Sequence, residues 1–202
     1  MKIILASNNK GKLREMRQLL AELEVEVLSQ REAGCDFEVE ETGTTFEENA
    51  RLKAAAVTEA TGLPAVADDS GLEVLALGGE PGVYSARYSG SHDHSDSYRN
   101  EFLLKKMENV QHRGAKFVSC VCCIFPNGDA LESRGECRGE ILRAPSGENG
   151  FGYDPLFRPE GFEKTMGELD DFEKNAISHR GESFRAFKSA LRGYTSKNEG
   201  SN

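Results

Sequence analysis

The sequence predicts a mixed α/β fold, and three patterns along its 202 residues support this prediction. Short apolar runs alternate with helical patterns through the first half of the chain, a long β-hairpin follows, and one more helix completes the pattern. This order is typical of a mixed, twisted sheet with flanking helices. A hydrophobic content of 38% and a charged content of 29% agree with an ordinary globular protein rather than a disordered one.

The first half begins with a strand, a helix, a second strand and a second helix. Apolar residues at helical spacing predict the first helix, and the Thr45-x-x-Glu48 capping box predicts where the second begins. Gly62 and Pro64 then end that helix near Thr61. The expected ranges are a strand over 2–6, a helix over 11–23, a strand over 25–28 and a helix over 45–61.

The second half begins with a small apolar strand over 64–67, which runs into Asp68-Asp69-Ser70-Gly71, and an extended segment resumes over 72–75. A helix ending near Met107 follows a polar loop over 89–97. Asn127-Gly128 predicts the turn of a β-hairpin, because this dipeptide suits the tightest hairpin connections. The remaining ranges are hairpin strands over 115–126 and 129–137 and a helix over 181–192. We expect one domain over residues 1–194 and a disordered polar tail over 195–202.

Charge and cysteine usage narrow the class of protein. A net charge of -9 excludes a dominant basic surface for nucleic acid. The apolar start is too short for a signal peptide, and no run approaches the roughly 18 apolar residues of a membrane helix, so we expect a cytoplasmic protein with no membrane partner. Cys120, Cys122 and Cys123 share one apolar run, which predicts reduced core cysteines rather than a zinc site.

A basic turn follows the first strand. Lys10, Lys12 and Arg14 crowd a helix start, where the helix dipole favours acids by about 0.3–1 kcal/mol each. Free backbone N–H groups at such a turn bind anions, although a solvated basic turn remains open. The glycines of a Walker loop are missing. The candidate anion-binding residues are Ser7, Asn8, Asn9, Lys10, Gly11 and Lys12.

Acidic residues form a second candidate group. Asp68 and Asp69 follow a buried strand, and Glu38, Glu40 and Glu41 lie on an earlier loop. Carboxylates gathered at strand ends repel one another unless a cation or protons intervene, and oxygen ligands of this kind suit Mg²⁺. An exposed acidic loop is the alternative, and it fits Glu38 better than the two aspartates.

Three further features suggest a phosphate or purine ligand. Lys53 lies on the apolar stripe of the second helix, where it either binds phosphate or extends from the core to solvent. Ser178 is a natural N-cap, so Lys174, His179 and Arg180 gather at a positive helix end. The glycines of residues 147–155 allow close backbone approach, and there Phe151 or Tyr153 offers a face to a purine while Asp154 accepts hydrogen bonds from a base edge. A tight turn with core aromatics is the alternative for that loop.

Taken in order, the motifs resemble one enzyme family over nearly the whole chain. They are Ser7-x-Asn9-x-x-Lys12, Glu40-Glu41-Thr42-Gly43-x-Thr45-Phe46-x-x-Asn49-Ala50, Asp68-Asp69-Ser70-Gly71-Leu72, Pro81-Gly82-Val83-Tyr84-Ser85-Ala86-Arg87-Tyr88, Phe151-Gly152-Tyr153-Asp154-Pro155 and Ser178-His179-Arg180. The family is the inosine/xanthosine triphosphate pyrophosphatases. The resemblance implies Mg²⁺-dependent hydrolysis of ITP, dITP and XTP to the monophosphate and pyrophosphate. It also implies two lobes around a central cleft, and a homodimer.

The resemblance also implies roles for individual residues. Asp69 corresponds to the general base, and Glu40 with Asp69 to the metal site. The triphosphate side corresponds to residues 7–12, Lys53 and Ser70. The nucleotide and its base correspond to Phe151, Gly152, Tyr153, Asp154, Lys174, His179 and Arg180.

One departure and two rival functions accompany this assignment. The loop over 91–96 carries His92 and His94. Two solvated histidines are a simpler interpretation of this loop than a metal site. A phosphatase that forms an aspartyl-phosphate on Asp68 or Asp69 is one rival. A non-catalytic nucleotide-binding protein is the other, and the carboxylates argue against it because they repel phosphate.

Overall fold

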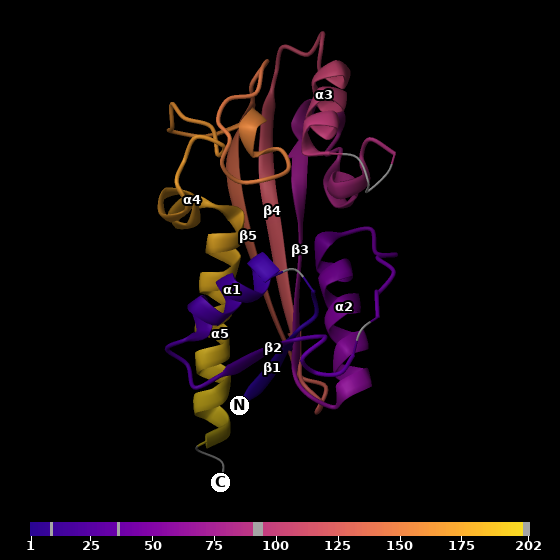
Figure 1. The fold of residues 1–202 in the computed structure, drawn as a ribbon, viewed down its shortest axis with the longest axis vertical. Coiled ribbons are helices and arrows are strands. Elements are labelled where there is room, and N and C mark those ends of the chain that lie inside the picture. The colour runs from indigo at the N-terminus through magenta and orange to yellow at the C-terminus, as the bar shows by residue number, and fades with distance from the viewer. Residues whose placement is uncertain (9, 36, 91–94, 200–202) are drawn as a thin grey trace. The chain divides into compact units, whose positions relative to one another are not determined.

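The structure is a computed structural model, and it describes residues 1–8, 10–35, 37–90 and 95–199. Six strands form one sheet in the order β2-β1-β3-β4-β5-β6, flanked by helices (Figure 1). The predicted mixed α/β fold is therefore confirmed. The elements are β1 Lys2–Leu5, α1 Lys10–Leu20, β2 Glu26–Ser29, α2 Phe46–Thr61, β3 Ala65–Val74, η1 Leu75–Leu77, η2 Gly82–Arg87, α3 Asp96–Lys106, β4 Gly114–Ile124, β5 Ala130–Ile141, η3 Asp154–Leu156, β6 Phe157–Pro159, α4 Asp171–Ile177 and α5 His179–Glu199.

The chain divides into two compact units. The first contains residues 1–69, 119–135 and the chain from Ser183 onward, and the second contains residues 70–118 and 136–182. The boundary falls inside β3, between Asp69 and Ser70. Each unit has its own core. The cleft between two lobes stays a prediction.

Parallel pairing organises the first unit. Strand β1 pairs with β2 from Lys2↔Glu26 to Leu5↔Ser29, and with β3 at Ile4↔Ala65 and Leu5↔Val66. Successive side chains of a strand point to opposite faces, so each strand contributes to two cores. On one face Val66 packs with residues of α1 and α5. On the other face Ala65 and Ala67 pack with residues of α2.

The second unit packs around one cluster of buried apolar side chains. Leu72 and Val74 of β3, Leu103 of α3, and the aromatic residues Phe117 and Phe157 belong to it. The rings of Phe117 and Phe157 lie 4.6 Å apart between centroids. This core supports the two features that matter below, the glycine-rich loop over 147–154 and the start of α3.

The predicted end of the third strand at Ala67 is wrong. Strand β3 is ten residues long, and Asp68, Asp69, Ser70 and Gly71 lie within it. Polar residues usually end a buried strand because burying an unpaired charge is costly. Both aspartates are buried here but have lysine partners, described below, and the backbone therefore continues as a strand.

The helices follow their predicted start signals closely, but not all their predicted ends. The Thr45 capping box begins α2, and Gly62 ends it with φ 66°. The predicted disorder of the tail is wrong for residues 195–199, which continue α5. Tyr194 packs its ring 4.1 Å from that of Phe125 between centroids, which anchors this part of the helix. Residues 200–202 lie outside the described chain.

The cysteine prediction agrees with the structure. All five cysteines are buried and free, and burial raises the pKa of each thiol for which a shift is resolved, to about 11 for Cys122 and Cys137. A high thiol pKa disfavours the thiolate that binds metals and attacks disulfides. Among the described residues, no helix combines the length and apolarity needed to cross a membrane.

Candidate active site

Strand β1 lies between β2 and β3, and the carboxyl end of β1 is the point where the strand order of the sheet reverses. From β1 the chain passes through α1 to β2, and from β2 it returns through α2 to β3 on the other side of β1. Helices α1 and α2 therefore pack on opposite faces of the sheet. Open α/β sheets bind their ligands at such a switch point. Strand β3 continues past the end of β1, so its two aspartates lie at this edge.

The pleat of β3 separates the two aspartates. Asp68 shares the face of Val66, where α1 packs, and its Oδ1 lies 2.7 Å from Lys12 Nζ. Only 1% of the Asp68 side chain is exposed. Lys12 was expected to face an anion, and in the structure its ammonium group neutralises a buried carboxylate of the same unit. Asp68 is therefore a structural and electrostatic partner of the helix start.

Asp69 points to the opposite face, where α2 packs. Lys53 of α2 lies between two carboxylates, with Nζ 2.7 Å from Glu41 Oε1 and 3.5 Å from Asp69 Oδ1. The exposed fractions are 15% for the Lys53 side chain and 12% for that of Asp69. The apolar stripe of α2 thus carries the lysine to an acidic site. The sequence marked Glu41 only as one of several loop acids, because its contact with Lys53 spans twelve residues.

Electrostatics give Asp69 the properties of a proton acceptor. Burial raises its pKa, Lys53 opposes this rise, and the nearby Glu41 and Asp68 carboxylates add to it. Burial alone would lower the pKa of Lys53, but the charges of Asp69, Asp68 and Glu41 outweigh burial and raise it. The lysine therefore stays cationic at neutral pH. Functional sites often hold buried, coupled groups of this kind.

One oxygen of Asp69 has the character of a metal ligand. Its Oδ2 is buried and makes no hydrogen bond among the described residues. Asn49 lies nearby, held by the Gly43 N–H at 2.8 Å, and its amide lowers the pKa of Asp69. A buried carboxylate oxygen that accepts no well-formed hydrogen bond suits a hard cation such as Mg²⁺. The residues present thus fit the predicted metal at Asp69.

The predicted second ligand, Glu40, stays a prediction. Glu40 is exposed on the loop before α2. Within the described chain, no three His, Cys, Asp or Glu side chains gather closely enough to form a metal site by themselves. A metal at Asp69 would therefore need ligands from water or substrate, which is how Mg²⁺ usually binds.

The predicted anion turn after β1 is partly described. Ser7 is half-buried and Asn8 is exposed, while Asn9 lies outside the described residues. Lys10 is the first residue of α1, and the first turn of this helix contains no acidic residue. The helix start thus keeps the positive character that the sequence predicted.

A second cluster, in the other unit, surrounds Phe151. Its side chain is 56% exposed, although Lys174 Nζ and the Arg180 guanidinium lie 4.8 Å and 4.9 Å from the ring centroid. Arg180 Nη2 also donates to Ser70 Oγ at 3.1 Å. A partly exposed aromatic ring with two cations over it suits a flat ligand ring with electron-rich, polar edges.

The structure separates the roles of the loop residues that the sequence left open. Tyr153 is a core residue, 4% exposed, and its hydroxyl donates to Ser85 O at 2.9 Å. Asp154 is buried, and its Oδ2 accepts hydrogen bonds from Phe151 N at 2.8 Å and Lys174 Nζ at 2.6 Å. Asp154 thus holds the loop and orients Lys174. Of the two aromatic residues, only Phe151 is exposed.

Two more predicted residues belong to this unit. His179 is buried in the first turn of α5, and its ring stacks on that of Phe117 at 4.8 Å between centroids. The Ser178 hydroxyl accepts from Gly181 N at 3.0 Å, which confirms Ser178 as the N-cap. Arg180 therefore leaves a well-anchored helix start to reach Phe151. The predicted His92 and His94 lie outside the described residues.

Comparison with known proteins gives one consistent result. The model of the Ham1 family matches residues 3–190. A dITP/XTP pyrophosphatase of Deinococcus radiodurans is 51% identical over 191 residues, covering 94% of this chain and 92% of the relative. A dITP/XTP pyrophosphatase of Thermus thermophilus is 49% identical over 194 residues, covering 95% and 92%.

Solved structures agree with the sequence comparison. The Staphylococcus aureus Ham1 protein superposes with a TM-score of 0.90 at 43% identity, covering 96% of this chain and all of that chain. The similarity therefore extends over the elements that carry both clusters.

Proposed function

Because the chain belongs to the Ham1 family, we propose that it is a nucleoside triphosphate pyrophosphatase that hydrolyses ITP, dITP and XTP to the monophosphate and pyrophosphate. The printed names of its relatives, dITP/XTP pyrophosphatases, support this reaction class and substrate class. They also agree with the resemblance drawn from the motifs.

The buried Asp69 carboxylate is the observation that carries the proposal. Its raised pKa, its Oδ2 without a hydrogen bond, and the cationic Lys53 on its other oxygen suit a group that accepts a proton beside an anionic substrate. A protein that only bound nucleotides would gain nothing from a buried carboxylate, because it repels phosphate.

In the proposed reaction, water attacks the α-phosphorus directly. Asp69 orients the water and accepts its proton as the new P–O bond forms. The bond from the α-phosphorus to the bridging oxygen then breaks, and pyrophosphate leaves with that oxygen. Lys53 and the N–H groups at the start of α1 stabilise charge on the phosphates.

A divalent cation completes the charge balance. We propose that Mg²⁺ binds at Asp69, with Glu40 as the predicted second ligand. When bound, it neutralises charge on the phosphate oxygens and lowers the barrier to attack.

The purine is proposed to bind at Phe151. Stacking on an aromatic ring contributes about 1–3 kcal/mol per base. Hypoxanthine and xanthine carry a 6-oxo acceptor, which Arg180 or the start of α5 can satisfy, whereas the amino group of adenine offers a donor. We also propose that the protein is a homodimer and that it is located in the cytoplasm.

Replacing Asp69 by asparagine tests the catalytic role. In the proposal, Asp69→Asn loses nearly all turnover of ITP with Mg²⁺ but keeps its fold. Glu38→Gln is the matched control, because it removes an exposed acid of the loop before α2. Near-normal turnover by Asp69→Asn, measured as released pyrophosphate, would show that the role assigned to Asp69 is wrong.

A further inference from the structure

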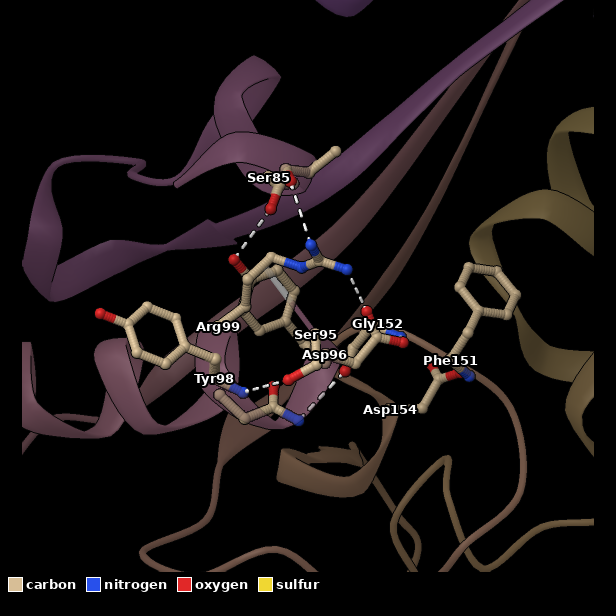
Figure 2. A network of polar contacts seen from close by, with 11 residues as sticks. Ser85, Ser95, Asp96, Tyr98, Arg99, Phe151, Gly152 and Asp154 are labelled. Atoms are coloured by element: carbon tan, nitrogen blue, oxygen red, sulfur yellow. Dashed lines mark hydrogen bonds and ion pairs between the residues drawn. The ribbon is translucent and has the colours of Figure 1, made fainter. Parts of the chain in front are cut away.

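Side chains from the first turns of α3 form hydrogen bonds to the loop that carries Phe151. Both backbone polar groups of Gly152 bind α3 side chains: its N–H donates to Asp96 Oδ2 at 2.6 Å, and its C=O accepts from Asn100 Nδ2 at 3.1 Å (Figure 2). Asp96 and Asn100 are four residues apart on a helix, so they lie on the same face, one turn apart. Together they form a two-point clamp on a single peptide residue.

The clamp is itself fixed in place. Arg99 forms an ion pair with Asp96 (Figure 2). It also donates through Nη1 to Ala86 O at 3.3 Å, which ties Asp96 to the η2 segment. Asn100 is buried with 6% of the residue exposed. Ser95 caps the helix by accepting from Tyr98 N at 3.2 Å. The two side chains that reach Gly152 therefore have little conformational freedom to lose.

The position of Gly152 makes this clamp relevant to Phe151. Gly152 follows Phe151 directly and adopts a φ of 62°, which an L-residue rarely takes. On its other side, Phe151 N is held by Asp154 Oδ2 at 2.8 Å. The backbone of Phe151 is thus fixed at both ends while its ring stays exposed. Such a loop presents the ring in one orientation.

We propose that Asp96 and Asn100 are positioning residues that preorganise Phe151 for the purine ring. This inference rests on the proposed function, because it assigns the clamp to the purine subsite of that reaction. Neither residue touches the substrate in this account. A preorganised loop binds more tightly because less conformational entropy is lost on binding.

Amide hydrogen exchange of the loop over residues 150–154, without nucleotide, tests the clamp itself. Removing a charge-assisted hydrogen bond frees the Gly152 N–H, so Asp96→Ala is expected to speed exchange of this segment at least about tenfold. Asn100→Ala leaves the Asp96 bond intact but loosens the loop, and serves as the second variant if Asp96→Ala fails to fold. Glu101→Ala is the control, because Glu101 is exposed on the same helix and its side chain makes no hydrogen bond or ion pair to a described residue.

Steady-state kinetics with ITP and Mg²⁺ tests the consequence for the purine. Both alanine variants are expected to raise KM about tenfold while changing kcat by less than about threefold, since the chemistry at Asp69 is untouched. Asp96→Asn keeps an acceptor for Gly152 and is expected to recover most of the wild-type KM. If Asp96 had a merely structural role, Asp96→Ala would lower both kcat and the free energy of unfolding. Asp96→Asn would then not restore the wild-type KM.

The two measurements separate the two claims. Faster exchange with an unchanged KM, or unchanged exchange in both alanine variants, overturns the positioning role. A wild-type protein that fails to release pyrophosphate from ITP overturns the proposed function instead, and the exchange measurement still decides whether the clamp holds the loop. Faster exchange, raised KM and rescue by Asp96→Asn support the inference.

Discussion

Asp69→Asn is expected to stabilise the protein while it removes activity. The carboxylate is buried on the face of α2, and burial together with Glu41 and Asp68 disfavours its charge more than Lys53 favours it. Asparagine has nearly the same shape and no charge. Lys53 keeps its 2.7 Å contact with Glu41, so the substitution leaves no buried cation without a partner.

The size of the effect follows from these contacts. A single substitution that relieves a destabilised functional site raises the free energy of unfolding by about 0.5–2 kcal/mol. For a chain of this length, each 1 kcal/mol shifts Tm by about 2–4 °C. Lys53→Met is the opposite perturbation, because it leaves the Glu41 and Asp69 carboxylates facing each other. With only 15% of the lysine exposed, we expect a loss of about 3 kcal/mol.

The pH dependence of the unfolding free energy tests the same predicted gain in stability. The folded-state pKa of Asp69 is raised above the ordinary value of 3.8, so the folded protein binds this proton more tightly than the unfolded chain. The penalty for the charged form is therefore fully present above the folded-state pKa and disappears as the pH falls toward 3.8. Asp69→Asn should gain most over the wild type near neutral pH, and progressively less in acid.

Urea unfolding followed by circular dichroism measures these differences at each pH. The expected order of unfolding free energies at neutral pH is Asp69→Asn, wild type, Lys53→Met. A loss of stability in Asp69→Asn comparable with that in Lys53→Met would refute the reasoning. It would mean that Asp69 is an ordinary ion-pair partner rather than a destabilised functional group.

Three other substitutions have defined consequences. Lys12→Met leaves the carboxylate of Asp68 buried without its cation and should lower the unfolding free energy, measured in urea, by about 3–5 kcal/mol. Gly150→Ala places a Cβ 2.2 Å from Asp154 Oδ2 at a φ of 77°, so Tm should fall and the KM for ITP should rise. Thr45→Ala removes the cap of α2 and should cost about 1 kcal/mol in urea unfolding without a change in KM. Equal costs at Thr45 and Lys12 would contradict this ranking.

Local signals predicted the helix starts, because their causes lie within a few residues. The Thr45 capping box and the Ser178 N-cap depend on contacts three residues away. The capping box of Asp170 and Glu173 begins α4 in the same local way, although no helix was predicted there. Long-range contacts were the harder part. The predicted strand ended too early, at Ala67, because the lysines that neutralise the aspartates of β3 come from two different helices.

The site shows the same division between local and long-range information. Separate motifs predicted Lys53 and Asp69 as site residues, but the contact between Glu41 and Lys53 appears only in the folded structure. Phe151 and Tyr153 were equivalent by pattern, and burial distinguishes them, since one is 56% and the other 4% exposed. The clamp at Gly152 had no sequence signal, because Asp96 lies more than fifty residues before it.

Hydrolysis of ITP in ¹⁸O-labelled water, with Mg²⁺ present, tests the central claim most directly. Direct attack by water on the α-phosphorus predicts one ¹⁸O atom in the inosine monophosphate, none in the pyrophosphate, and no orthophosphate. Mass spectrometry of the products resolves these outcomes. Label in pyrophosphate, or release of orthophosphate through an aspartyl-phosphate, would contradict the account.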